Sequence, residues 1–125
     1  MIDQRELESI ESLWTGGIKD ALAAYHPAAS IIGGGQSERV ALAAALVEVA
    51  LDIQRLGGEA PAPPDLLRGD LCLARASRLL AETRHQPLQI AFARAIEELS
   101  AAAAVPGGSI PAVRHRLLQA IESAR

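Results

Sequence analysis

The sequence has few aromatic residues and a single cysteine. Of its 125 residues, one each is Trp, Tyr and Phe, and the apolar half consists mostly of Ala, Leu, Ile and Val. Ala and Leu are the strongest helix formers, whereas the aromatic residues that favour strands are scarce. The thiol of Cys72 cannot form an internal disulfide, which suggests a reducing compartment. This composition predicts an all-α protein with a thin core, because alanine buries little apolar area.

Basic clusters and long apolar runs are also missing. The 12 basic residues, almost all Arg, are spread singly and are outnumbered by 15 acidic ones, so we expect no nucleic-acid partner. The longest apolar run, 40–47, is far shorter than the roughly 20 residues that cross a bilayer. The acidic start of the sequence, 1–11, lacks the apolar core of a signal peptide. We therefore expect a cytoplasmic protein without integral membrane insertion.

Apolar residues recur at helical spacing in several segments that are separated by Gly and Pro. We predict a single-domain bundle of four to five helices over 1–125, with N-terminal helices (1–26), core helices (37–104) and a C-terminal helix (109–124). The expected helices cover about 3–14 with a continuation over 18–25, and then 37–56, 66–83, 88–104 and 110–123. Ser37, Asp65 and Ser109 are the expected N-caps. Pro27 and the prolines of 61–64 are expected to lie outside helices.

The segment 40–51 is apolar except for Glu48, which predicts a central helix that is buried nearly all round. The expected helix 66–83 has one apolar arc, and the expected helices 88–104 and 110–123 have one apolar stripe each. The short connection 84–87 predicts that the helices on either side of it are an antiparallel pair. Arg94 and Glu98 are expected to form an exposed pair one turn apart. The expected apolar positions are Leu66, Cys72, Leu73, Ala76, Leu79, Leu80, then Leu88, Phe92, Ala95, Ile96, Leu99, and finally Val113, Leu117, Leu118 and Ile121.

Glu48, Asp52 and Arg55 are spaced four and three residues apart and so share one face of the central helix. One interpretation is a carboxylate pair for a divalent cation, with Arg55 close enough to bind a phosphate. The alternative is that these are the few solvated positions of a buried helix. We favour the alternative, because magnesium sites need several oxygen ligands and usually a substrate phosphate.

No other motif predicts a catalytic or metal site. The glycine pairs at 34–35 and 57–58 follow no strand and lack the Lys-Ser/Thr of a phosphate-binding loop. His26, His85 and His115 lie far apart, without a second ligand at zinc spacing. Cys72 falls on an apolar arc, where a thiol is usually a small core residue.

Gly69 and Asp70 stand together near the start of the third expected helix. The helix dipole favours an acidic residue in the first turn, which is a sufficient structural reason for Asp70. Glycine inside a helix costs about 1 kcal/mol relative to alanine. Gly69 therefore suggests that another backbone approaches the helix closely there.

The segment 66–82 begins Leu-Leu-Arg-Gly-Asp-Leu-Cys-Leu-Ala-Arg-Ala and resembles the trans-polyprenyl diphosphate synthases, in which a helix starts with a Leu-x-Gly-Asp-Tyr-Leu-like phrase. The resemblance covers about 36–104 and places the central helix where that family has its first aspartate-rich motif. Catalytic members carry Asp-Asp-x-x-Asp there, whereas this sequence has Asp52-Ile53-Gln54-Arg55. The family's Gly-Gly-Lys-Arg-like phosphate element is reduced to Gly34-Gly35-Gln36-Ser37, and its second aspartate-rich motif is not found.

These departures make the sequence more similar to the small, non-catalytic subunit of two-component heptaprenyl or hexaprenyl diphosphate synthases, which keep an Ala-Leu-Asp phrase, here 50–52. The resemblance implies part of the isoprenoid synthase fold and a catalytic prenyl diphosphate synthase subunit as partner. It also implies no cofactor of the chain's own, with Mg²⁺ bound by the partner, and a role in setting product length. Glu48, Asp52 and Arg55 would be the degenerate aspartate-rich region. The expected interface residues are Leu66, Gly69, Asp70, Leu73, Ala76 and Leu80.

Two alternatives stay open from the residues alone. The first is a helical adaptor or homo-oligomeric interaction module without a link to isoprenoids. The second is an independent enzyme or lipid-binding module that uses Glu48 and Asp52 in an apolar groove. Self-association would favour the first alternative, and binding of Mg²⁺ with a prenyl diphosphate would favour the second.

Overall fold

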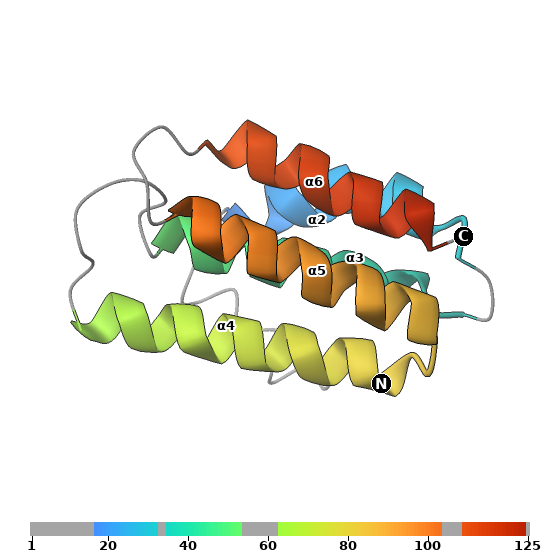
Figure 1. Ribbon diagram of the computed structural model, residues 1–125, viewed down its shortest axis with the longest axis horizontal. Helices are drawn as coiled ribbons and strands as arrows, with labels where there is room; N and C mark the ends of the chain where they lie inside the picture. Colours follow the sequence, from blue (N-terminus) through green and yellow to red (C-terminus); the bar gives the residue numbers. More distant parts are fainter. Residues whose placement is uncertain (1–16, 33–34, 54–62, 104–108, 125) are drawn as a thin grey trace.

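The computed structural model of the chain describes residues 17–32, 35–53, 63–103 and 109–124. The predicted helix over 3–14 lies outside these ranges. The described part contains no strand, which confirms the all-α prediction, and none of its helices has the length and hydropathy needed to cross a bilayer. Its helices are α2 (Gly17–Ala29), α3 (Ser37–Ile53), α4 (Pro63–Glu82), α5 (Gln86–Ala103) and α6 (Ile110–Ser123) (Figure 1).

The central position of α3 is confirmed. Every residue of 40–51 is buried, including five alanines whose small side chains let neighbouring helices approach closely. α2 and α4 make the most extensive contacts with α3, and α5 and α6 pack on it less extensively (Figure 1). A helix that is apolar on all sides is stable in water only when it is covered on all sides.

The apolar stripes predicted for the last two helices face the core. Leu88, Phe92 and Ala95 of α5 are fully buried, as are Leu117 and Ile121 of α6. α4 and α5 run antiparallel on either side of a short turn, as expected (Figure 1). They contact each other little, however, because the apolar arc of α4 packs mainly against α3 while α5 packs mainly against α6.

Three prolines that were expected to lie outside helices, Pro27, Pro63 and Pro64, are inside them. α2 continues through Pro27 to Ala29. Tyr25 and Ala29, on either side of the proline, are both fully buried, and this burial favours a continuous helix. α4 begins at Pro63, so the prediction of Asp65 as its N-cap is wrong. Proline is compatible with the first helical turn, where the backbone N–H has no partner within the helix.

The helix starts show one confirmed cap, one corrected cap and one that was not predicted. The hydroxyl of Ser109 accepts a hydrogen bond from the N–H of Ala112 at 3.3 Å, which confirms this residue as the N-cap of α6. Ser37 is the first residue of α3 instead of its cap, since the N–H of Val40 donates to the carbonyl of Gln36. His85 caps α5, because its Nδ1 accepts from the N–H of Leu88 at 3.1 Å.

Cys72 provides a test of the core. Its side chain is 1 % exposed on the face of α4 that packs against α3, and burial raises the pKa of the thiol to about 12. Because the thiolate is the reactive species, we expect an aromatic disulfide reagent to label the native protein only through local opening of α4. Labelling should be immediate in denaturant and slower by about 10²-fold or more in the folded state. Equal labelling rates in the two states would contradict the packing of α4 on α3.

Candidate functional site

A polar cluster ties three helices together inside the apolar bundle. Glu48, in the middle of α3, is 5 % exposed, and its carboxylate accepts three hydrogen bonds. Oε1 accepts from Tyr25 Oη at 2.8 Å and from Arg114 Nε at 2.8 Å, while Oε2 accepts from Arg114 Nη2 at 2.8 Å. Arg114 Nη2 also donates to Asp20 Oδ2 at 3.1 Å. We call these four residues the Glu48 cluster.

The positions of these side chains follow from the local helical pattern. Tyr25 lies on the buried face of α2, with the fully buried Ala21 and Ala29 one turn away on either side. Arg114 lies in α6 next to the buried Val113. A carboxylate in an apolar interior is costly unless it is paired and hydrogen-bonded. The carboxylate of Glu48 is paired with the guanidinium of Arg114 through two hydrogen bonds, and it also accepts a hydrogen bond from the hydroxyl of Tyr25. Both requirements are therefore met.

The protonation states in the cluster are those of a structural contact. Burial raises the pKa of Tyr25 far above its ordinary value, and the adjacent negative charge of Glu48 raises it further. The hydrogen bonds that Arg114 donates, first to Glu48 and then to Asp20, raise its pKa as well. The phenol is therefore neutral and the guanidinium charged at ordinary pH. Neither group can exchange a proton near neutrality, as a general acid or base must.

The structure separates Glu48 from Asp52, the two carboxylates considered as a cation-binding pair. Both oxygens of Glu48 accept hydrogen bonds from α2 and α6, whereas Asp52 is exposed one turn further along α3. Arg55 lies outside the described residues. The interpretation of Glu48 as a solvated position is wrong, because the charge is neutralised within the core. The apolar residues on either side of Glu48 could have indicated that its side chain is buried. A buried acid requires a basic partner.

Most of the predicted interface residues of α4 are turned toward the protein's own interior. Gly69, Ala76 and Leu80 are buried, and Leu73 is partly buried against the core. Asp70 is exposed. Leu66 lies in the first turn of α4, and the environment of its side chain is outside the described part of the chain. Residues buried against α3 in this way are not available to a second polypeptide.

The outward face of α4 instead presents two leucines that the sequence analysis did not select. Leu67 and Leu71, one helical turn apart, are 62 % and 53 % exposed. Their spacing was the signal that could have found them, because residues four apart share a helix face and these two lie outside the predicted apolar arc. We call Leu67, Leu71 and the exposed Ala74 the α4 outer face.

The α4 outer face lies on a different helix from the Glu48 cluster, which belongs to α2, α3 and α6. Within the ranges described above, no group of three or more His, Cys, Asp or Glu side chains could hold a metal ion. Protein-family models, curated proteins and solved structures give no match to this chain.

The phenol of Tyr25 reports directly on the cluster. Since Tyr25 is the only tyrosine, the tyrosinate absorbance of an alkaline titration belongs to this residue alone. We expect its midpoint well above the ordinary value of about 10 in the folded protein, and near 10 in denaturant. Because the pKa of Tyr25 is higher in the folded than in the unfolded protein, the neutral phenol stabilises the fold fully at a pH below the unfolded pKa. This stabilisation is lost as the pH rises toward the folded pKa. A midpoint near 10 in the folded protein would contradict the burial of Tyr25 against Glu48.

Removing the charge of Glu48 should destabilise the bundle. Glu48→Gln leaves the guanidinium of Arg114 without its buried partner, and breaking such a pair costs about 3 kcal/mol or more. Chemical denaturation should show this loss as a lower midpoint. The matched control is Glu82→Gln, because Glu82 is 41 % exposed and pairs at 3.6 Å with Arg39 and Arg78, so its change should stay below about 1 kcal/mol. Equal losses in the two variants would show that the Glu48 cluster has no special role.

Proposed function

We propose that the protein is a non-catalytic subunit that binds another polypeptide chain through the α4 outer face. The proposal rests on the exposure of Leu67 and Leu71 on α4, a helix that packs mainly against α3. α4 forms one edge of the bundle (Figure 1). Burying an exposed leucine contributes about 1.5–3 kcal/mol, so covering both would stabilise a complex appreciably.

The partner that we propose is the catalytic chain of a long-chain prenyl diphosphate synthase, as the resemblance of 66–82 to that family implies. Gly69 and Asp70, the most specific part of the resemblance, lie in the first half of α4, between Leu67 and Leu71 in the sequence; Asp70 is exposed and Gly69 is buried. The carboxylate of Glu48 is occupied by Tyr25 and Arg114, so the Mg²⁺ and the allylic diphosphate would be bound by the partner. This chain would then help set the length of the product.

A second candidate is self-association through the same face. Asp70 and Arg78 are both exposed and lie four residues before and four residues after Ala74. In an antiparallel pair of α4 helices centred on Ala74, each Asp70 would therefore lie opposite the Arg78 of the other copy. Such an isologous contact is the usual form of a homodimer interface. The small side chain of Ala74 would allow the two helices to approach closely at the centre.

Substitution of the two exposed leucines tests the proposed surface. We expect Leu67→Ser/Leu71→Ser to weaken binding to the catalytic chain by about 10²-fold, because the contact loses two buried leucines. The fold should be unaffected, since both side chains are already solvated. Light scattering of the mixed chains, together with chromatography of the prenyl products, measures complex formation and product length.

The matched control is Ile31→Ser, because Ile31 follows α2 and is 52 % exposed, much like Leu71. It should leave the complex and the product length unchanged. A wild-type chain that changes neither the activity nor the product length of the synthase would overturn the proposed partner. Dimerisation that is abolished by the double leucine variant would then support the second candidate.

A further inference from the structure

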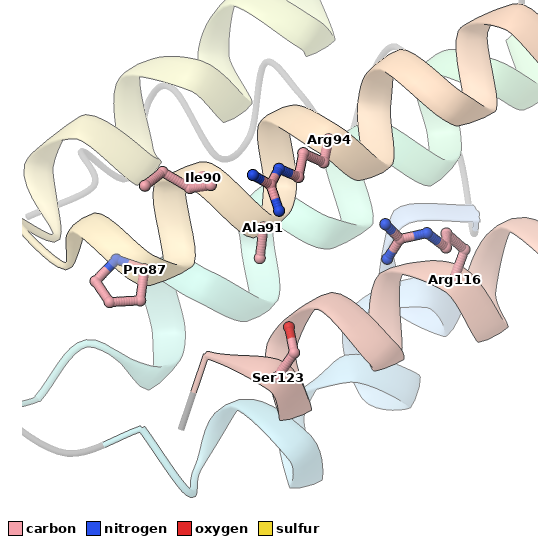
Figure 2. Close-up of a pocket in the computed structure, with 6 residues that line it drawn as sticks. All are labelled: Pro87, Ile90, Ala91, Arg94, Arg116 and Ser123. Carbon is pink, nitrogen blue, oxygen red and sulfur yellow. The ribbon is translucent and has the colours of Figure 1, made fainter.

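A groove with a distinctive charge runs between α5 and α6, away from the α4 outer face. It has a volume of about 400 Å³, which is within the range of small-molecule sites. α5 provides most of its lining, and α6 provides the opposite wall. The lining residues are Pro87, Ile90, Ala91 and Arg94 of α5 with Arg116 and Ser123 of α6 (Figure 2).

The groove is apolar at one end and cationic at the other. Figure 2 shows Pro87 and Ile90 at one end, with the guanidinium groups of Arg94 and Arg116 toward the other. Ile90 is 46 % exposed, and Ala91 lies partly buried beside it. From 87 to 94, the helix rises by about 10 Å, which is the length available to an apolar chain.

The cationic end carries more positive than negative charge. Arg116 Nε donates to Glu98 Oε2 at 2.7 Å, which orients the guanidinium and leaves its terminal nitrogens as further donors. Arg94 and Glu98 are not in direct contact as predicted, because Glu98 reaches across to α6; Arg116 first, and then the charge of Arg94, lower the pKa of Glu98. Within the described ranges, no carboxylate lies within ion-pair distance of Arg94. Two arginines and one carboxylate leave one positive charge, in a chain whose net charge is −3.

The cavity between α2 and α6 lacks this excess of positive charge. It has about 450 Å³ and also contains an arginine, Arg114. That guanidinium is already hydrogen-bonded to Glu48 and Asp20, so two carboxylates face one arginine there. An anion would be repelled at this cavity and attracted to the α5–α6 groove.

We propose that the α5–α6 groove binds a monoanionic amphiphile, namely a carboxylate joined to an unbranched hydrocarbon chain of medium length. The carboxylate would lie between Arg94 and Arg116, whose fixed forks of N–H donors match its two oxygens. The chain would extend along Ala91 and Ile90 toward Pro87. One negative charge balances the excess charge of the site, and the hydrocarbon chain covers the exposed face of Ile90. The site shares no residue with the α4 outer face and does not depend on its partner.

Calorimetric titration with decanoate, below the concentration at which it forms micelles, tests this proposal. We expect one decanoate per chain, with acetate and decanol each binding at least about 10-fold more weakly, because acetate lacks the apolar chain and decanol lacks the charge. Arg94→Gln and Arg116→Gln should each weaken decanoate binding by at least about 10-fold. Arg68→Gln on α4 is the matched control, because Arg68 is also an exposed arginine, and it should bind decanoate like the wild type.

Each other outcome contradicts the proposal. Decanol that binds as tightly as decanoate would show that the groove recognises only apolar surface. An equal effect of Arg68→Gln and Arg94→Gln would show non-specific attraction to the protein's arginines. Absence of binding at millimolar decanoate would exclude the site. Arg94 is exposed, so its variant should keep the thermal midpoint of the wild type, and this measurement separates loss of the site from loss of the fold.

Discussion

The structure depends on the buried negative charge of Glu48, in an apolar interior where a charge is strongly destabilising unless it is paired. Glu48 interrupts an apolar helix that is covered on all sides, and it is tolerated because α2 and α6 bring Tyr25 and Arg114 to its carboxylate. An alanine-rich core can pack in several registers, because alanine contacts are small and similar to one another. A buried ion pair has one favourable geometry, so the Glu48 cluster selects one arrangement of α2, α3 and α6.

This arrangement also engages the one charged side chain on the buried part of the central helix. The carboxylate that could have taken part in a cation site is fully engaged, and its neighbour Asp52 is exposed one turn away. The two interactions that we propose use surface features of the described helices instead. They are the leucines of the α4 outer face and the arginines of the α5–α6 groove, which lie on different helices.

Local patterns were sufficient to predict that α2 to α6 are helical and that α3 is central, because their apolar residues recur at helical spacing. They failed at Pro27, where the burial of nearby residues decides the outcome, and at Pro63 and Pro64, where the first helical turn tolerates proline. The partners of Glu48 could not be predicted, because Tyr25 and Arg114 are 23 and 66 residues away in the sequence. The predicted interface on α4 selected the arc that packs against α3, since a sequence shows which residues are apolar but not which of them are covered.

Amide hydrogen exchange with and without the candidate catalytic chain tests the central claim most directly, because it locates the contact without changing any residue. The account predicts that the partner slows exchange along α4 and leaves α6 unchanged, since among the described helices α4 is the one with exposed leucines. Unchanged exchange in α4, or protection confined to another helix, would contradict the claim that this protein works through its edge helix.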